Sequence, residues 1–409
     1  MFIALLLQGL NSCVEKGCTD PEALNYRQSA ERDDESCRYG DKYEEEKREV
    51  LINHANLAHA FYKDALAQAL SLQIVIGQFL DKPTDDGFSL VKLTWQSSYY
   101  SYAQCAPLRF SDGPIDDSPN LHQILGTWPI KPADVDYTRN GESGVVYDSD
   151  LIPEINASTL TALNDADRIV CGFHAMEYLL WGEDYLPPGD LTVGFRAFTD
   201  YELGDSTRVD VERRRQYLSV LAELIVANLT TLTNEWDENG VDKYRSRFLR
   251  LPVNTAMKQV ITGIATLCRS EMAERAMTFP KFNGIDAYEI SAYSDNTAID
   301  LIAMHAGIEI LMNGLYTPLN GMEVSGRSLI NLADIYNSDL ATSITDQLEA
   351  NKEALEIIPK PFDYQLAQEA EFGEGPIAAA AKELEVLEDL LFELAREMDF
   401  GLNTDLPDN

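Results

Sequence analysis

The stretch "CGFHAMEYLLWGED", residues 171–184, is apolar almost all round when it is drawn as a helix, yet it carries two ionisable side chains. His174 and Glu177 are three residues apart, which is nearly one helical turn, so their side chains share a face. Burying such a pair costs free energy unless each partner is satisfied. The stretch therefore predicts a buried helix whose polar pair is either a structural lock or part of a functional site.

The rest of the chain predicts further helices and almost no strands. Apolar residues such as Leu51, Leu57 and Phe61 recur at helical spacing. Helical patterns cover residues 41–80, 88–110, 158–182, 206–236, 253–279, 286–316 and 375–401, whereas 111–155 is an irregular connection rich in Asp, Pro, Gly and Asn. We expect an all-α protein with two helical-bundle domains packed side by side, at residues 43–200 and 201–409.

The ends of the central helices carry recognisable signals. Asn164 or Asp165 is the expected N-cap of the helix that contains His174, and Gly182 is its expected stop. Ser206 is a candidate cap for the long helix that follows.

Charge and the N-terminal residues indicate location and exclude some partners. The 409 residues carry a formal net charge of −36, which repels nucleic acid and anionic lipid. Residues 1–13 resemble a secretory apolar region followed by a lipobox, with Cys13 as the lipidated residue. We expect an exported protein, periplasmic or anchored to the outer membrane, that touches the membrane only through this lipid.

A second feature near the start is a pair of cysteines, Cys18 and Cys37, within residues 14–42. The segment resembles the short Cys-bounded, Asp- and Asn-rich modules of exported bacterial envelope proteins, and a Cys18–Cys37 disulfide fits an oxidising compartment. Its acidic side chains predict either a calcium site or a solvated loop; they are Asp20, Asp33, Asp34 and Glu35. The remaining cysteines have apolar surroundings and predict buried thiols; they are Cys105, Cys171 and Cys268.

The spacing of the histidines limits the chemistry. No two of the five histidines are four residues apart, so the HExxH pattern of a zinc peptidase is absent. A GxSxG elbow and a phosphate-binding glycine loop are absent too. A His and a Glu at i and i+3 offer one nitrogen and one oxygen to iron, copper or zinc, but two ligands are too few. A buried ion pair that holds helices in register is the competing interpretation.

These residues also carry a family resemblance. Gly172, His174 and Glu177 match the GxHxxE motif of the imelysin family of bacterial envelope proteins. Other segments resemble that family in the same order, across roughly residues 47–405: "FLDKPT", Trp95, "ILGTWPI", "RAFTDY", "SEMAERAM" and "EISAYSDNTAIDLIAMHAGI". The resemblance implies an all-α protein of two bundle-like domains with the motif near their interface, secreted or membrane-anchored and linked to iron uptake, with an older peptidase label. Many members carry a Thr-Glu or Ser-Glu pair where this chain has Cys105-Ala106, so one carboxylate is missing.

Several residues are candidates to complete a site with His174 and Glu177. The possible further metal ligands are Asp295, Asp300 and Glu289, and the possible ligand-binding residues are Arg196, Arg275 and Ser294. Each has an ordinary alternative: Ser294 as a helix cap, the arginines as salt-bridge partners, and Glu271 as the i, i+4 partner of Arg275. Trp181 is expected to close the wall of the pocket, and His305 to be a core histidine.

Three functions are compatible with this sequence. The first is an envelope protein that binds iron or another divalent metal, or an iron-containing ligand, at an interdomain cleft and serves an envelope uptake system. The second is a metallohydrolase or peptidase with His174 as metal ligand and Glu177 as the catalytic base. The third is a structural or adhesion module in which the pair only locks the domains together.

Overall fold

The protein is described here by a computed structural model. It describes residues 15–21, 23, 26–37, 40, 43–117, 119–184, 193–204, 209–283 and 289–404, with the side chains of residues 282 and 283 left out. The chain forms two compact units, Met1–Arg48 and Glu49–Asn409, and each is described by itself. The described residues confirm the all-α prediction, since their only paired strands are β1 (Leu315–Tyr316) and β2 (Val324–Ser325), a short antiparallel hairpin.

The first unit is a small loop structure closed by a disulfide. Cys18 and Cys37 are bonded to each other, which confirms the predicted pairing. The Asp33 and Asp34 carboxylates accept hydrogen bonds from the backbone N–H groups of Glu35 and Ser36, as in Asx turns. These local bonds shape the acidic loop, and calcium binding there stays a prediction. Cys13 lies outside the described residues.

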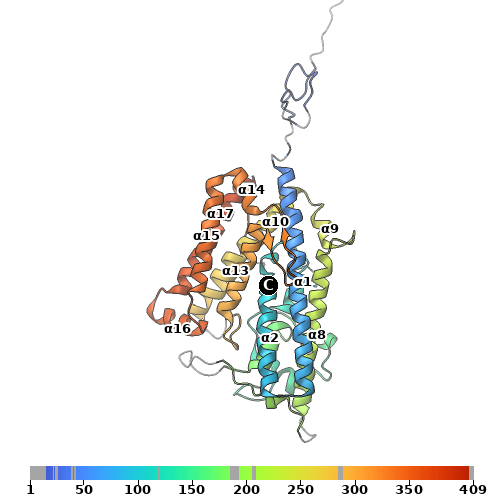
Figure 1. Ribbon diagram of the computed structural model, residues 1–409, viewed down its shortest axis with the longest axis vertical. Coiled ribbons are helices and arrows are strands. Elements are labelled where there is room, and N and C mark those ends of the chain that lie inside the picture. Colours follow the sequence, from blue (N-terminus) through green and yellow to red (C-terminus); the bar gives the residue numbers. More distant parts are fainter. Residues whose placement is uncertain are drawn as a thin grey trace, which may run out of the picture. The chain divides into compact units, whose positions relative to one another are not determined.

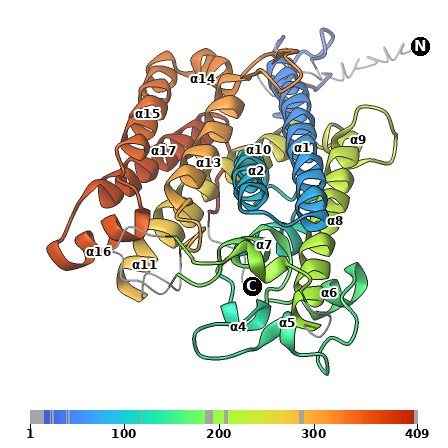
Figure 2. The same ribbon diagram turned by 60° about the horizontal axis from the view of Figure 1, so that its bottom comes forward.

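Long helices form one side of the second unit. Helix α1 (Glu44–Asp81) and helix α2 (Asp85–Ala103) are separated by the predicted break, where Thr84 caps α2 through its hydroxyl. Helix α8 (Val209–Trp236) runs beside α1 (Figures 1 and 2), and Thr233 donates to the Tyr62 carbonyl across this contact. Helix α9 (Tyr244–Phe248) follows α8.

A second group of helices comes from the C-terminal half. Helices α13 (Thr297–Asn313), α14 (Leu329–Tyr336), α15 (Ser338–Glu356) and α17 (Pro376–Glu397) pack together (Figure 1). Helix α10 (Val253–Thr266) continues into a π-helix, η4 (Leu267–Thr278), and both pack on α17. Helices α11 (Phe279–Asn283) and α16 (Phe362–Phe372) contact each other.

The two groups meet through α2 and α13, which pack directly. Helix α7 (Gly172–Trp181), which precedes the predicted domain boundary, packs on α8, which follows it. The division at residue 200 stays a prediction. Among the described residues, no helix combines the length and apolar character needed to cross a bilayer.

The predicted irregular connection 111–155 is confirmed, because it holds only short helices. These are α3 (Leu121–Leu125), α4 (Pro132–Val135) and α5 (Gly144–Tyr147), preceded by the short turn η1 (Ala106–Leu108). Helix α6 (Ala157–Leu163) follows the connection, and η3 (Phe198–Tyr201) follows α7.

The predicted continuous helix over 158–182 is wrong. The chain leaves the helical path after α6 because the Asn164 carboxamide oxygen accepts from the backbone N–H groups of Val170 and Cys171, at 2.8 and 3.0 Å. Helix α7 then starts at Gly172, with Cys171 as its N-cap rather than Asn164 or Asp165. Gly172 has φ +87°, and a Cβ there would collide with the Leu125 carbonyl oxygen, so only glycine fits.

Of the other predicted helix ends, one is confirmed, one is wrong and one lies outside the described residues. Gly182 ends α7 as expected, with φ +73°. The helix predicted from residue 286 starts instead at Thr297, because residues 291–295 form turns in front of it. The predicted cap Ser206 lies outside the described residues, and α8 is described from Val209.

Candidate functional site

Helix α7 lies in the interior of the second unit. All ten of its residues are buried, which explains why the sequence is apolar on every face. It packs against α2, α3, α4 and α8, so its two ionisable side chains are surrounded by other parts of the protein.

His174 and Glu177 bond to each other, as their spacing predicts. The Nδ1 atom of His174 lies 3.1 Å from Oε2 of Glu177. On the opposite side of the ring, Nε2 lies 2.9 Å from the Tyr99 hydroxyl of α2. His174 is 2% exposed and Glu177 is fully buried, so this three-residue chain lies out of contact with bulk water.

The second carboxylate oxygen of Glu177 reaches the start of α13. Oε1 accepts three hydrogen bonds, from the backbone N–H of Tyr293 at 3.0 Å and from the backbone N–H and hydroxyl of Ser294 at 2.9 and 2.8 Å. An oxygen that accepts three donors is typical of an ionised carboxylate. Ser294 is therefore a partner of Glu177 and not the predicted helix cap, since Asn296 occupies that position.

This arrangement assigns the tautomer of His174. The Glu177 carboxylate accepts, so Nδ1 carries the proton and donates to Oε2, and Nε2 accepts from Tyr99. Burial raises the pKa of Tyr99 well above its ordinary value, and the charge of Asp300 adds to this, so the phenol keeps the proton that it donates. Both ring nitrogens of His174 are occupied, and neither has a lone pair directed at a metal ion.

Direct coordination by the motif pair is therefore not supported in this arrangement. Both nitrogens of His174 and both oxygens of Glu177 already have partners within the protein. Throughout the part of the chain that the structure describes, no three His, Cys, Asp or Glu side chains are grouped to hold a metal ion. The motif pair instead links α7 to α2 on one side and to the residues in front of α13 on the other.

The predicted acidic candidates form a group around Glu177. Asp300 and Glu289 are buried, and Asp295 is partly buried. Each has one carboxyl oxygen with no hydrogen-bond donor within 3.5 Å among the described residues: Asp300 Oδ2, Glu289 Oε1 and Asp295 Oδ1. The hydroxyl groups of Ser291 and Thr297 still lie close enough to Asp300 and Glu289, respectively, to lower the pKa of each carboxyl group. The other oxygen of Asp300 accepts from the Asn296 side chain at 2.7 Å.

The same three carboxyl groups resist ionisation. Burial raises the pKa of Asp300 and of Glu289 well above the ordinary value, and burial raises the pKa of Asp295 to about 7. The negative charge of Glu177 acts in the same direction on all three. The structure thus places the carboxyl groups of Glu289, Asp295 and Asp300 within electrostatic reach of Glu177.

Aromatic rings pack beside His174, on the side of the ring that faces Tyr99. Trp95 of α2 stacks on Tyr99 with 5.2 Å between ring centroids, and Trp181 packs edge-on to Trp95 at the same distance. The Trp95 indole N–H donates to the Phe173 carbonyl at 3.1 Å. Trp181, the last residue of α7, is 4% exposed, and its predicted role in a pocket wall stays a prediction.

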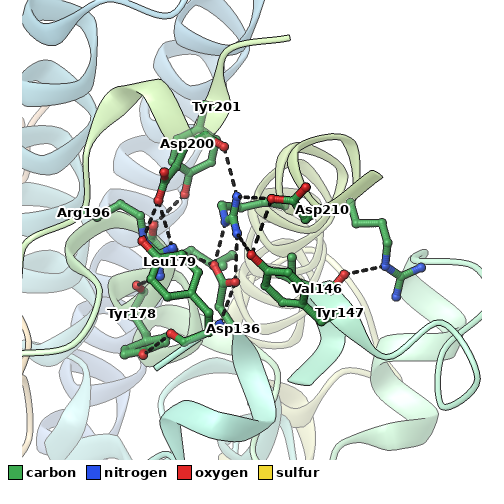
Figure 3. A network of polar contacts seen from close by, with 12 residues as sticks. Asp136, Val146, Tyr147, Tyr178, Leu179, Arg196, Asp200, Tyr201 and Asp210 are labelled. Carbon is green, nitrogen blue, oxygen red and sulfur yellow. Dashed lines mark hydrogen bonds and ion pairs between the residues drawn. The ribbon is translucent and has the colours of Figure 1, made fainter. Parts of the chain in front are cut away.

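Arg196 belongs to a different polar network, shown in Figure 3. Its Nη1 lies 2.9 Å from Oδ2 of buried Asp136 and 3.3 Å from Asp200. Arg214 of α8 binds the same Asp136 carboxylate through Nε and Nη2, at 2.7 and 3.0 Å. Arg196 is therefore a salt-bridge partner, which was the alternative to a ligand-binding role. Through Asp136 it connects the segment after α7 to Arg214 of α8.

Arg275 also has protein partners. Its Nη1 donates to Glu271 at 3.2 Å, which confirms the predicted i, i+4 pair, and its guanidinium lies over the Trp128 ring. Arg109 donates to the other Glu271 oxygen at 2.9 Å. Burial alone raises the pKa of Glu271, but the two arginines outweigh burial and hold that pKa below its ordinary value.

The position where the family resemblance lacked a carboxylate holds a buried thiol. Cys105 donates to the Ser101 carbonyl within α2 and lines a small cavity of about 20 Å³ with Arg109 and His122. This volume fits roughly one water molecule. Cys171 and Cys268 are also free and buried, which confirms the prediction for all three thiols.

Some functional candidates carried no local sequence signal. Tyr99 lies in "SSYYSYA", where the aromatic residues look alike, and only its contact with His174 distinguishes it. The donors from residues 293 and 294 are largely backbone groups, which every sequence has. His305 is a buried core histidine, as predicted, and burial lowers its pKa to about 4.

Comparisons with known proteins agree with this architecture. A family model described as Imelysin matches residues 58–391. The fold is similar to the crystal structure of a putative iron-regulated protein A precursor from Parabacteroides distasonis ATCC 8503, with a TM-score of 0.65 and 17% identity over 88% of this chain and 96% of that one. The fold is also similar to the crystal structure of an imelysin-like protein from Psychrobacter arcticum 273-4. The TM-score is 0.58 and the sequence identity 14%, over 90% of this chain and 99% of that one. No curated protein matches the chain.

Proposed function

Because the chain belongs to the imelysin family, we propose that it is an exported envelope protein that binds an iron-containing ligand beside Glu177. The similar structure titled an iron-regulated protein supports the link to iron. The Cys18–Cys37 disulfide supports an oxidising compartment outside the cytoplasm. As part of the same proposal, Cys13 is a lipid attachment site, and the bound ligand is passed to an envelope uptake system.

The observation that carries this proposal is the set of oxygens on Glu289, Asp295 and Asp300 that accept no hydrogen bond from the described residues. Buried polar atoms nearly always have a hydrogen-bond partner, so three such oxygens around one carboxylate indicate a missing cationic or donor group. Carboxylate oxygens are hard donors that suit ferric iron. The raised pKa values mean that a cation arriving here displaces protons, which couples binding to pH.

The ligand in this proposal is an iron complex rather than a bare ion. The described residues do not assemble three protein ligands, so iron that reaches the carboxylates needs ligands of its own. A chelate brings those ligands and fills the remaining coordination positions. Iron is then the cargo of the protein and not a resident cofactor.

The motif pair has a positioning role in this proposal. Glu177 holds the backbone of Tyr293 and Ser294, and these residues directly precede Asp295. His174 holds the Glu177 side chain in place through Nδ1. The pair thereby fixes the turn that presents Asp295 and, further along α13, Asp300.

The hydrolase hypothesis finds less support in this geometry. A general base needs an oxygen that is free to accept a proton from a nucleophile. Glu177 is fully buried, and both of its oxygens already accept hydrogen bonds. A catalytic role would require the start of α13 to move away from Glu177.

The proposal is tested with ferric nitrilotriacetate as the probe. The protein is incubated with the complex, separated by gel filtration and assayed for bound iron, and nitrilotriacetate alone serves as a blank. We expect iron to stay with the wild type and affinity to fall at least tenfold in Asp295→Asn and Asp300→Asn. Asn has nearly the shape of the Asp300 side chain, and its amide oxygen can still accept from Asn296, so we expect the fold to be kept. Asp334→Asn, at an exposed position of α14, is the matched control.

Two results contradict the proposal. One is that the wild type retains no iron. The other is that the Asp295 and Asp300 variants retain as much as Asp334→Asn. Iron binding should also weaken as pH falls through about 7, where Asp295 takes up its proton.

A further inference from the structure

A separate hollow of about 460 Å³ lies on another part of the second unit. One wall is a face of α1 with Asn56, His59 and Lys63, and the opposite walls come from Arg245 of α9 and from Asn320 and Ser325 at the β1–β2 hairpin. In Figure 1, helix α9 lies beside the upper half of α1. The hollow shares no residue with the site around Glu177.

Arg245 is the unusual feature of this hollow. The residue is only 9% exposed, and its guanidinium donates to the neutral carboxamide oxygen of Asn56 at 2.7 Å. Among the described residues, no carboxylate lies within 4.0 Å of its guanidinium. Arginine is rarely buried without a paired anion, because the desolvation of its charge must be compensated.

Three carboxylates line the hollow, those of Asp64, Glu238 and Glu323, and none of them lies within 4.0 Å of the Arg245 guanidinium. Asp64, in the wall of the hollow, accepts from the Tyr316 hydroxyl at 2.6 Å and from the Leu319 backbone at 2.9 Å. Asp237 forms an ion pair with Lys243 at 3.4 Å. Burial lowers the pKa of Arg245, and the charges of Glu238 and Asp237 oppose this without reversing it.

Two further basic groups share the hollow with Arg245. Lys63 is exposed at its edge, and His59 is half-buried in its wall. Burial lowers the pKa of His59; Asp237 opposes this shift, and the positive charges of Lys63 and Arg245 add to it. All three groups line the same hollow, so one bound molecule can contact them together.

We propose that this hollow binds a small anion, through a carboxylate or phosphate group that pairs with Arg245 and Lys63. The planar guanidinium matches either group with two parallel hydrogen bonds. The Asn320 and Ser325 side chains offer hydrogen bonds to hydroxyl groups on the same molecule, so a hydroxylated anion such as a sugar acid or sugar phosphate fits the volume. This inference does not depend on iron binding beside Glu177.

The test is calorimetric titration with inorganic phosphate and, separately, with galacturonate. The titration is run at about 0.15 M salt, because the repulsion between the net charge of −36 and an anion is then screened beyond about 8 Å. We expect saturable binding of one anion per chain, at least tenfold weaker in Arg245→Gln and weaker in Lys63→Gln. Arg247→Gln is the matched control, since Arg247 lies on the same helix with its side chain 53% exposed and outside the hollow.

The two probes distinguish the sources of the shared chemistry. Tighter binding of galacturonate assigns the hollow to carboxylates, and tighter binding of phosphate assigns it to phosphate groups. The inference is overturned if neither probe binds, or if Arg245→Gln binds as the wild type does. Lys63 is exposed, so Lys63→Gln gives an answer even where the arginine variant folds poorly. In that case unchanged binding in Lys63→Gln counts against the site.

Discussion

Replacing Glu177 tests whether the motif pair is a lock between α7 and the start of α13. Its carboxylate takes part in four hydrogen bonds, one with His174 and three with donors of residues 293 and 294. Glu177→Ala leaves these donors buried without a partner, at about 1–3 kcal/mol each. Because water enters the space and such losses are not additive, we expect a loss of about 4 kcal/mol or more in the free energy of unfolding, which is exceptional for one substitution.

The substitution Glu177→Gln separates loss of charge from loss of the acceptor. Its amide oxygen still accepts from the Tyr293 and Ser294 donors, and its amide N–H₂ donates to His174 once the ring adopts the other tautomer. We expect the free energy of unfolding to fall by about 1–3 kcal/mol, because hydrogen bonds to a neutral amide are weaker than those to a carboxylate. The assay is urea denaturation, with Glu223→Gln at an exposed position of α8 as the control. The hypothesis that Glu177 locks α7 to the start of α13 is refuted by either of two results. One is an equal loss of unfolding free energy in Glu177→Ala and Glu177→Gln, and the other is a loss below about 1 kcal/mol in Glu177→Ala.

Two further predictions concern the charged groups around α7. Asp136→Asn removes the negative charge that pairs with both buried Arg196 and buried Arg214. We expect urea denaturation to show a loss of about 3–5 kcal/mol in the free energy of unfolding. A loss below about 1 kcal/mol would show that the network is dispensable for stability. Asp295 binds a proton more tightly in the folded state, because burial raises its pKa to about 7, so its contribution to stability falls as pH rises from about 4 to 7. Asp295→Asn should remove that part of the pH dependence of the melting temperature, and an unchanged profile would contradict the raised pKa.

The sequence predicts much of the fold because helical periodicity is a local property. The break before α2, the short helices of 111–155, the stop at Gly182 and the buried thiols all follow from neighbouring residues. The start of α7 does not, since it depends on the Asn164 side chain turning back to the backbone of residues 170 and 171. An Asn in front of an apolar run is ambiguous between a helix cap and this loop.

The site is predicted in its residue types but not in its connections. The sequence identifies His174, Glu177 and the acidic residues before and within α13, and the structure groups them. The sequence cannot show that both oxygens of Glu177 already have partners, because three of the four donors belong to residues 116 and 117 positions away, and two of these three are backbone N–H groups. Asp136 and Arg214 are 78 residues apart and bear no motif, so their pairing with Arg196 is visible only in the fold.

The spacing of the motif explains why a pair that resembles metal ligands acts as a lock. Three residues along a helix let the His174 ring hold one oxygen of Glu177, and this leaves the other oxygen directed away from α7. That oxygen accepts hydrogen bonds from the backbone of residues 293 and 294, in front of α13. The conformation of this turn therefore depends on α7 as well as on the sequence of the turn. Asp295 directly follows this turn and takes φ +53°, so the carboxylates that carry the proposed ligand contact depend on the motif without the motif touching the ligand. Loss of binding in a His174 variant alone therefore cannot identify His174 as a ligand, and the Asp295 and Asp300 variants are the ones that decide.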